Sequence, residues 1–204
     1  MLKFSANLTM LFNEVDFLAR FEKASHEGFK GVEYLFPYAW KKEDLARELQ
    51  ENGLTQVLFN LPAGDWNAGE RGIACIPGRE SEFREGVEKA IEYAAALGCS
   101  QLNCLAGFTP RDESPEKVQA TLLENLRFAA DALEKKGIRL LVEALNSQDM
   151  PGFHLVRTAD VLKLLAEVGR ANVYVQYDVY HMQIMEGNLT RTLLDNLGRI
   201  SHIQ

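Results

Sequence analysis

The sequence predicts a parallel (β/α)8 TIM barrel, because short apolar segments alternate with amphipathic helical segments along the whole chain. Repeated strand–helix units imply a parallel sheet, since each crossover between parallel strands carries a helix. The regularity of the units favours a closed barrel. Glycines, which readily adopt the left-handed conformation that stops a helix, stand near the predicted helix ends; they are Gly28, Gly53, Gly98, Gly137, Gly169 and Gly198.

The elements follow one another in strict alternation. Apolar runs predict seven strands, at residues 2–8, 31–35, 54–60, 101–105, 138–145, 173–178 and 200–204. Helical periodicity predicts six helices between them, at residues 14–27, 41–51, 80–97, 115–136, 158–168 and 189–197. The alternative fold is an open doubly wound sheet, which usually carries a glycine-rich phosphate loop after its first strand. The turn at residues 7–13 contains no glycine, which disfavours this alternative.

The length of the chain bears on how complete the barrel is. Eight units typically take about 250 residues, whereas this chain has 204 and ends on a predicted strand. We therefore expect a single (β/α) barrel domain over residues 1–204, truncated within the seventh unit and lacking helix seven and the eighth unit. The unpaired edges of strands one and seven would recruit other chains. This predicts an inactive chain of reduced stability that associates as a homo-oligomer.

Charge and cysteine content limit the partners and the compartment. The net charge of −7 disfavours nucleic acid and anionic membranes as partners, and no run of apolar residues is long enough to span a bilayer. The three cysteines show no zinc-ribbon spacing, and free thiols suit a reducing compartment. We expect a cytoplasmic protein whose partner is a small molecule.

Polar residues at the ends of the predicted strands are the candidates for chemistry, because barrel active sites lie at the carboxyl ends of the strands. Glu143, Asp178 and Gln204 end strands five, six and seven. Two carboxylates and an amide oxygen suit a divalent metal ion, Mg²⁺ or Mn²⁺. The alternative is that the two acids cap loops or helix starts. Asn7 and Asn60 end earlier strands and could bind substrate hydroxyls.

Other candidate substrate-binding residues lie outside the strands. His181 follows Asp178 by three residues and could orient a substrate oxygen. The loop at residues 61–79 is long for a barrel loop, which predicts a lid. It carries Arg71 and Arg79, either of which could grip a carboxylate. The alternative for both arginines is a surface pair with Glu70 or Glu80.

Several segments together resemble the bacterial hydroxypyruvate isomerases, a group within the xylose-isomerase-like barrels. The most specific are Asn-Leu-Pro-Ala-Gly-Asp-Trp at 60–66 and Gly-Glu-Arg-Gly-Ile-Ala-Cys-Ile-Pro-Gly-Arg at 69–79; residues 4–8, 32–38, 176–178 and 180–183 agree as well. A sister group, the 2-oxo-tetronate isomerases, is similar but matches the loop less well. The resemblance covers essentially the whole chain.

The resemblance implies conversion of hydroxypyruvate to 2-hydroxy-3-oxopropanoate (tartronate semialdehyde) by proton transfer through an enediolate. It implies that Glu143 is a catalytic acid–base group, and that Glu143, Asp178 and Gln204 hold the metal ion. The family's second glutamate, on strand eight, has no counterpart in this chain. Three alternatives remain: another sugar-acid isomerase or epimerase, a truncated non-catalytic sugar-acid-binding remnant, and a DNA-repair endonuclease, which the charge of −7 disfavours.

Overall fold

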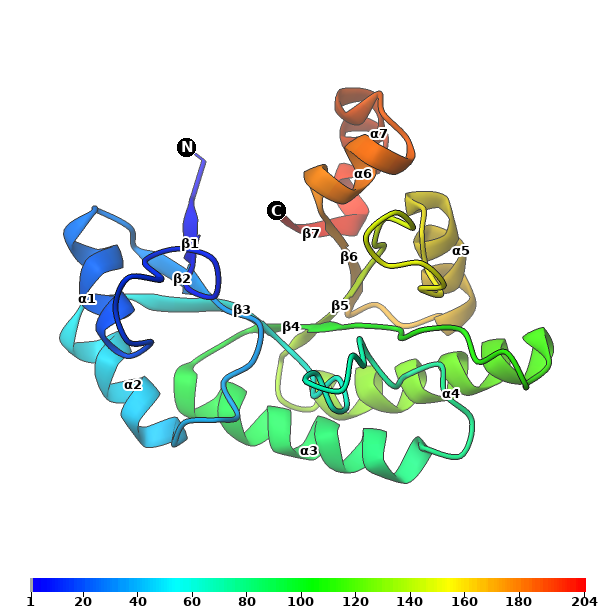
Figure 1. The fold of residues 1–204 in the computed structure, drawn as a ribbon, viewed down its shortest axis with the longest axis horizontal. Coiled ribbons are helices and arrows are strands. Elements are labelled where there is room, and N and C mark those ends of the chain that lie inside the picture. Colours follow the sequence, from blue (N-terminus) through cyan, green and yellow to red (C-terminus); the bar gives the residue numbers. More distant parts are fainter. Residues whose placement is uncertain (1) are drawn as a thin grey trace.

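The structure, a computed structural model, describes residues 2–204 and places seven parallel strands side by side in sequence order (Figure 1). The sheet curls into a half-barrel with helices on its outer side. This confirms the predicted fold class. The strands are β1 (Ser5–Asn7), β2 (Gly31–Glu33), β3 (Thr55–Asn60), β4 (Gln101–Cys104), β5 (Arg139–Glu143), β6 (Val173–Tyr177) and β7 (Ile200–Ile203).

Every helix up to residue 168 buries apolar side chains in the core, whereas the helix at Leu189–Asn196 has no buried residue. In α3 the buried residues recur at intervals of three and four, which forms a single stripe along the helix; they are Phe83, Val87, Ala90, Ala94 and Leu97. The helices are α1 (Ala19–His26), α2 (Lys42–Glu51), α3 (Glu80–Leu97), α4 (Pro115–Glu134), α5 (Thr158–Val168), α6 (Val179–Met185) and α7 (Leu189–Asn196), followed by the 3-10 helix η1 (Leu197–Arg199). No helix within residues 2–204 has the length and apolar character that a bilayer crossing requires.

The N-terminal elements are shorter than predicted. The strand expected at 2–8 is only Ser5–Asn7, and the helix expected at 14–27 begins at Ala19. A side chain explains the late start of the helix. Arg20 donates hydrogen bonds to the backbone carbonyls of Val15, at 3.1 Å, and Leu8, at 2.7 Å. These bonds hold the preceding segment as a series of turns.

One helix was missed by the sequence prediction. Residues Val179–Met185 form α6 directly after β6. The segment was not recognised because it is short and rich in β-branched and aromatic side chains, and only Met182 is buried. Asp178 caps it by accepting a hydrogen bond from the backbone N–H of His181 at 3.0 Å. This capping bond at the start of α6 therefore fixes the positions of two predicted site residues, Asp178 and His181.

Two β-bulges interrupt the register of the sheet beside the predicted site. Opposite Val32 and Glu33 of β2, strand β3 carries an extra residue between Gln56 and Leu58, and opposite Val175 and Gln176 of β6, strand β7 carries one between Ile200 and His202. A bulge re-aims the side chains that follow it and is common beside functional sites. Here each bulge lies opposite a buried polar residue of the neighbouring strand, since Glu33 is 4% exposed and Gln176 is 3% exposed.

The loop at 61–79 is fastened to the barrel along its second half. Cys75 donates its backbone N–H to the carbonyl of Ala106 at 2.9 Å, and the Asn125 side chain donates to the carbonyl of Ala74 at 2.9 Å. The backbone of Gly72 lies so close to that of Leu105 that a Cβ on it would stand 2.2 Å from the Leu105 oxygen. These contacts hold the second half of the loop against the barrel, so any movement of the predicted lid is confined to the residues before Gly72.

Candidate active site

A pocket of about 150 Å³ opens at the carboxyl ends of the strands. Every predicted metal-binding residue lines it, as do His181, Asn7 and Asn60. The complete lining is Asn7, Met10, Glu33, Tyr34, Leu35, Leu58, Asn60, Trp66, Leu105, Glu143, Leu145, Met150, Gln176, Asp178, His181 and Gln204. The topology predicted from the sequence therefore gathers these side chains from all seven strands and the loops that follow them into one place.

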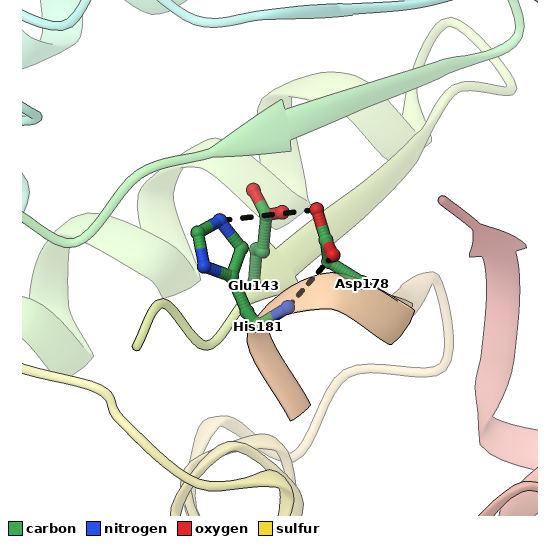
Figure 2. Close-up of side chains that lie close together, drawn as sticks. All are labelled: Glu143, Asp178 and His181. Atoms are coloured by element: carbon green, nitrogen blue, oxygen red, sulfur yellow. Dashed lines mark hydrogen bonds and ion pairs between the residues drawn. The ribbon is translucent and has the colours of Figure 1, made fainter. Parts of the chain in front are cut away.

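Glu143 lies at the end of β5 and is 5% exposed. Its Oε2 accepts a hydrogen bond from the Asn103 side chain at 3.0 Å, and Asn103 also donates to Asn60 Oδ1 at 3.0 Å. Figure 2 shows Glu143 facing Asp178 and His181. One oxygen or nitrogen atom from each of these three residues lies within 4.8 Å of the other two.

The environment of Glu143 opposes its ionisation. Burial, and then the neighbouring carboxylate of Asp178, raise the pKa of Glu143 from 4.5 to about 8. Hydrogen bonds from Gln176 and Asn103 lower the pKa but do not restore its ordinary value. An acid–base group with a pKa near neutrality is suited to accept and return protons at physiological pH.

Asp178 contributes one oxygen to helix capping and the other to the pocket. Its Oδ1 accepts from the backbone of His181, whereas Oδ2 lies 3.8 Å from His181 Nε2. The capping role considered from the sequence is therefore present for this acid, and it leaves the second oxygen free to face a ligand. Burial lowers the pKa of His181, which favours a neutral ring.

Gln204 reaches the pocket from the end of β7. Its Oε1 accepts from the Gln176 side chain at 2.8 Å, and its Nε2 donates to Glu33 Oε1 at 2.7 Å. His202, which alternates with Gln204 along the strand, places Nε2 2.7 Å from Glu33 Oε2. Burial by itself would raise the pKa of Glu33, but hydrogen bonds and attraction from these partners outweigh burial and lower it.

The two asparagines are held by neighbouring polar groups. Asn7 donates to Glu33 Oε1 at 3.5 Å and accepts from the backbone of Thr9 at 3.1 Å. Asn60 accepts from Asn103, as described above. Both side chains line the pocket, so both remain candidates for contact with substrate hydroxyls.

The structure separates the two arginines of the loop. Arg79 forms ion pairs with Glu70 and with Glu82, the latter at 2.7 Å, and it is not among the pocket-lining residues. The surface pairing with Glu70 considered from the sequence is therefore what the structure shows for Arg79. Arg71 instead places its guanidinium carbon 3.9 Å from the centre of the Trp66 ring. Arg71 does not line the pocket either, but it stacks on Trp66, which does, so Arg71 remains the candidate for binding a substrate carboxylate.

Sequence reasoning missed a second polar network, which contacts the Nδ1 atom of His181. Asn146 and Asp149 follow β5, and Tyr180 lies on α6. Tyr180 donates its hydroxyl to Asp149 Oδ2 at 2.6 Å, and Asn146 contacts both Asp149 and His181. These residues stand beyond the predicted strand end, where the sequence shows only a polar loop. Gln176 was missed because it lies within a strand rather than at its end.

Known proteins are similar to this chain over its whole length. The model of the xylose isomerase-like TIM barrel family matches residues 21–204. Hydroxypyruvate isomerase of Escherichia coli K12 is 58% identical over 100% of this chain and 79% of its own length. A 2-oxo-tetronate isomerase of Cupriavidus necator is 47% identical over 99% of this chain and 78% of its own.

A solved structure has nearly the same backbone. The structure of AP endonuclease, family 2 from Brucella melitensis matches with a TM-score of 0.97 and 50% identity, covering 100% of this chain and 79% of that one. The barrel fold, the pocket at the carboxyl ends of the strands and the similarities to known proteins all indicate the same family. The chain therefore belongs to the xylose isomerase-like TIM barrel family, beside the hydroxypyruvate and 2-oxo-tetronate isomerases.

Proposed function

We propose that this protein is an isomerase that converts hydroxypyruvate to 2-hydroxy-3-oxopropanoate. The observation that carries the proposal is the buried acid–base group Glu143, with a pKa of about 8, in a small polar pocket at the strand ends. The 58% identity to a hydroxypyruvate isomerase supports the choice of substrate. A pocket of about 150 Å³ suits a three- or four-carbon acid.

The reaction moves a carbonyl along a three-carbon acid. A base removes a proton from the hydroxymethyl carbon, and the electron pair left behind forms the double bond of an enediolate. A proton is then delivered to the former carbonyl carbon. The proton of the former hydroxyl group passes to the former carbonyl oxygen, so the hydroxyl oxygen becomes the new carbonyl and the carbonyl oxygen the new hydroxyl. Glu143 performs one of these two proton transfers, because it is the ionisable group poised near neutrality in the pocket.

The donor set fits a divalent cation, and we assign it to Glu143, Asp178 and Gln204. Two carboxylates converge there, and no lysine or arginine is among the pocket-lining residues to compensate them. Oxygen donors of this kind suit Mg²⁺, with Mn²⁺ as the alternative. When bound, the ion supplies positive charge that stabilises the oxygens of the enediolate. The positive charge would also favour the ionised, basic form of Glu143.

Arg71 is the residue we assign to the substrate carboxylate. Its stacking on Trp66 holds the guanidinium beside the pocket wall, and it donates hydrogen bonds to the backbone carbonyls of Trp66 and Glu70 through one nitrogen, Nη1. The remaining N–H groups of the guanidinium suit a paired contact with a carboxylate. The three free, buried cysteines support our placing the protein in the cytoplasm.

Two other substrates are the competing assignments. The 47% identity to a 2-oxo-tetronate isomerase favours a four-carbon acid as the second candidate. The solved structure named as an AP endonuclease makes a nucleic-acid substrate the third. The net charge of −7 disfavours the third, because phosphate backbones are bound by basic surfaces. A purely binding role is excluded if turnover is observed.

The test is turnover of hydroxypyruvate in ²H₂O with Mg²⁺, followed by proton NMR. We expect 2-hydroxy-3-oxopropanoate to form and the hydroxymethyl protons to exchange with solvent. Glu143→Gln should lower the rate by about 10²–10⁴-fold, whereas the exposed control Glu88→Gln on α3 should match the parent. If 2-oxo-tetronate is turned over with a higher kcat/KM, the substrate is 2-oxo-tetronate instead. If the wild-type protein shows neither proton exchange nor product, the proposed isomerase function is wrong.

A further inference from the structure

Two hydrogen-bond donors point at one ring nitrogen of His181. The backbone N–H of Asn146 donates to Nδ1 at 3.2 Å, and the side-chain Nδ2 of Asn146 lies 2.8 Å from the same atom. A backbone N–H can only donate. Nδ1 therefore accepts, and a proton on it would stand against two N–H groups.

The orientation of the Asn146 amide follows from its other partners. Its Oδ1 accepts from the backbone N–H groups of Gln148, at 3.1 Å, and Asp149, at 2.8 Å. A flipped amide would place its NH₂ group against those two donors. Nδ2 also donates to Asp149 Oδ2 at 2.9 Å, and the residue is 0% exposed. The amide is thus held with its nitrogen toward His181.

The opposite ring nitrogen of His181 faces the pocket. Nε2 lies 3.8 Å from Asp178 Oδ2, which is longer than a hydrogen bond, so Asp178 does not engage its proton (Figure 2). A neutral ring that accepts at Nδ1 carries its single proton on Nε2. Because His181 lines the pocket, that N–H is available to a ligand bound there.

We propose that Asn146 is a positioning residue that fixes His181 as the Nε2–H tautomer, so that His181 donates a hydrogen bond to a substrate oxygen instead of binding the metal ion. The inference rests on the proposed function for the identity of the substrate, and on geometry alone for the tautomer. A protonated Nε2 has no lone pair for a cation. Of the three converging groups, only the carboxylates of Glu143 and Asp178 can then serve as ligands. The N–H would stabilise negative charge that develops on the enediolate.

The tautomer can be measured directly in the 204-residue protein. Long-range ¹H–¹⁵N correlation spectra of ring-labelled protein separate its four histidines, and His181→Gln identifies the signal of His181. We expect a protonated Nε2 and an unprotonated Nδ1, both unchanged on addition of Mg²⁺. A proton on Nδ1, or an Nε2 signal that shifts as a metal ligand with Mg²⁺, would overturn the proposal without any variant.

The matched variants are Asn146→Asp and Asn125→Asp. The first replaces the side-chain N–H beside Nδ1 with a carboxylate oxygen, whose negative charge should draw the ring proton to Nδ1 although the backbone N–H of residue 146 still faces that atom. The second introduces an acid at another 0% exposed asparagine, on α4, and should leave the His181 signals unchanged. We expect kcat to fall by about 10²-fold in Asn146→Asp, with KM altered much less, because the lost donor acts on developing charge. An Asn146→Asp protein that keeps the parent tautomer would refute the role of Asn146.

Kinetics and spectra distinguish this proposal from the proposed function. If the wild-type protein shows the Nε2–H tautomer but does not turn over hydroxypyruvate, the tautomer assignment holds and the substrate assignment fails. If turnover is normal and Nε2 carries no proton, the role of Asn146 and His181 fails while the isomerase assignment holds.

Discussion

Replacing Glu143 with Gln should stabilise the protein at neutral pH while removing its activity. The folded state holds this carboxyl with a pKa of about 8, against 4.5 for an ordinary glutamate. At pH values between 4.5 and about 8, the Glu143 carboxyl is ionised in the unfolded chain and protonated in the folded state. Wild-type stability therefore falls as pH rises through this window, by about 1.4 kcal/mol per pH unit from this one group. The glutamine side chain of the variant cannot ionise, so the variant avoids a loss that reaches about 3 kcal/mol by pH 7.

The assay is urea unfolding of both proteins in a chelator, at a series of pH values from 4.5 to 8. The stability of Glu143→Gln minus that of the wild type should be near zero at the acid end and grow toward neutrality. Glu88→Gln, an exposed glutamate on α3, controls for loss of a negative charge. A difference that stays constant across the window would refute a raised pKa at Glu143. Addition of Mg²⁺ should narrow the difference, because the ion favours the ionised wild-type carboxylate.

Three further predictions concern the loop and the metal ion. Arg71→Ala should raise KM for hydroxypyruvate far more than KM for a neutral ketose. Arg79→Ala should leave KM for hydroxypyruvate nearly unchanged, because the Arg79 guanidinium is already ion-paired with Glu70 and Glu82. Steady-state kinetics of both variants test this. Mg²⁺ at 100 times its Kd should stabilise the wild type by about 2.7 kcal/mol, and Asp178→Asn should lose most of that gain in urea unfolding. Gly72→Ala should cost about 2–4 kcal/mol, because its Cβ would meet the Leu105 carbonyl, and Gly69→Ala, with open space around it, should cost only about 1 kcal/mol.

The strand-end residues show what could be predicted from the sequence about the site. Glu143, Asp178 and Gln204 were identified because polar residues end apolar strands, and parallel strands bring their carboxyl ends to one edge. The structure gathers all three into one pocket. Their roles as metal ligands, and the role of Glu143 as an acid–base group, remain predictions that the experiments above test.

The loop shows where sequence reasoning stopped. Arg71 and Arg79 lie eight residues apart on the same segment, and nothing in the residue types distinguishes them. The fold distinguishes them by what surrounds each. Arg79 begins α3 within reach of Glu70 and Glu82, whereas Arg71 stacks on Trp66 at the pocket wall.

The sequence by itself determined the parallel barrel, the order of its units and the strands whose ends line the pocket. These features depend on periodicity and chain order, which are local properties of the sequence. Only the tertiary structure decided the partners of each side chain: that Glu143 is buried against Asp178, that Gln204 bonds both Gln176 and Glu33, and that Asn146 contacts His181. Contacts of this kind join residues from different strands and loops, so their geometry is set by the packing of the whole barrel and leaves no local pattern to read.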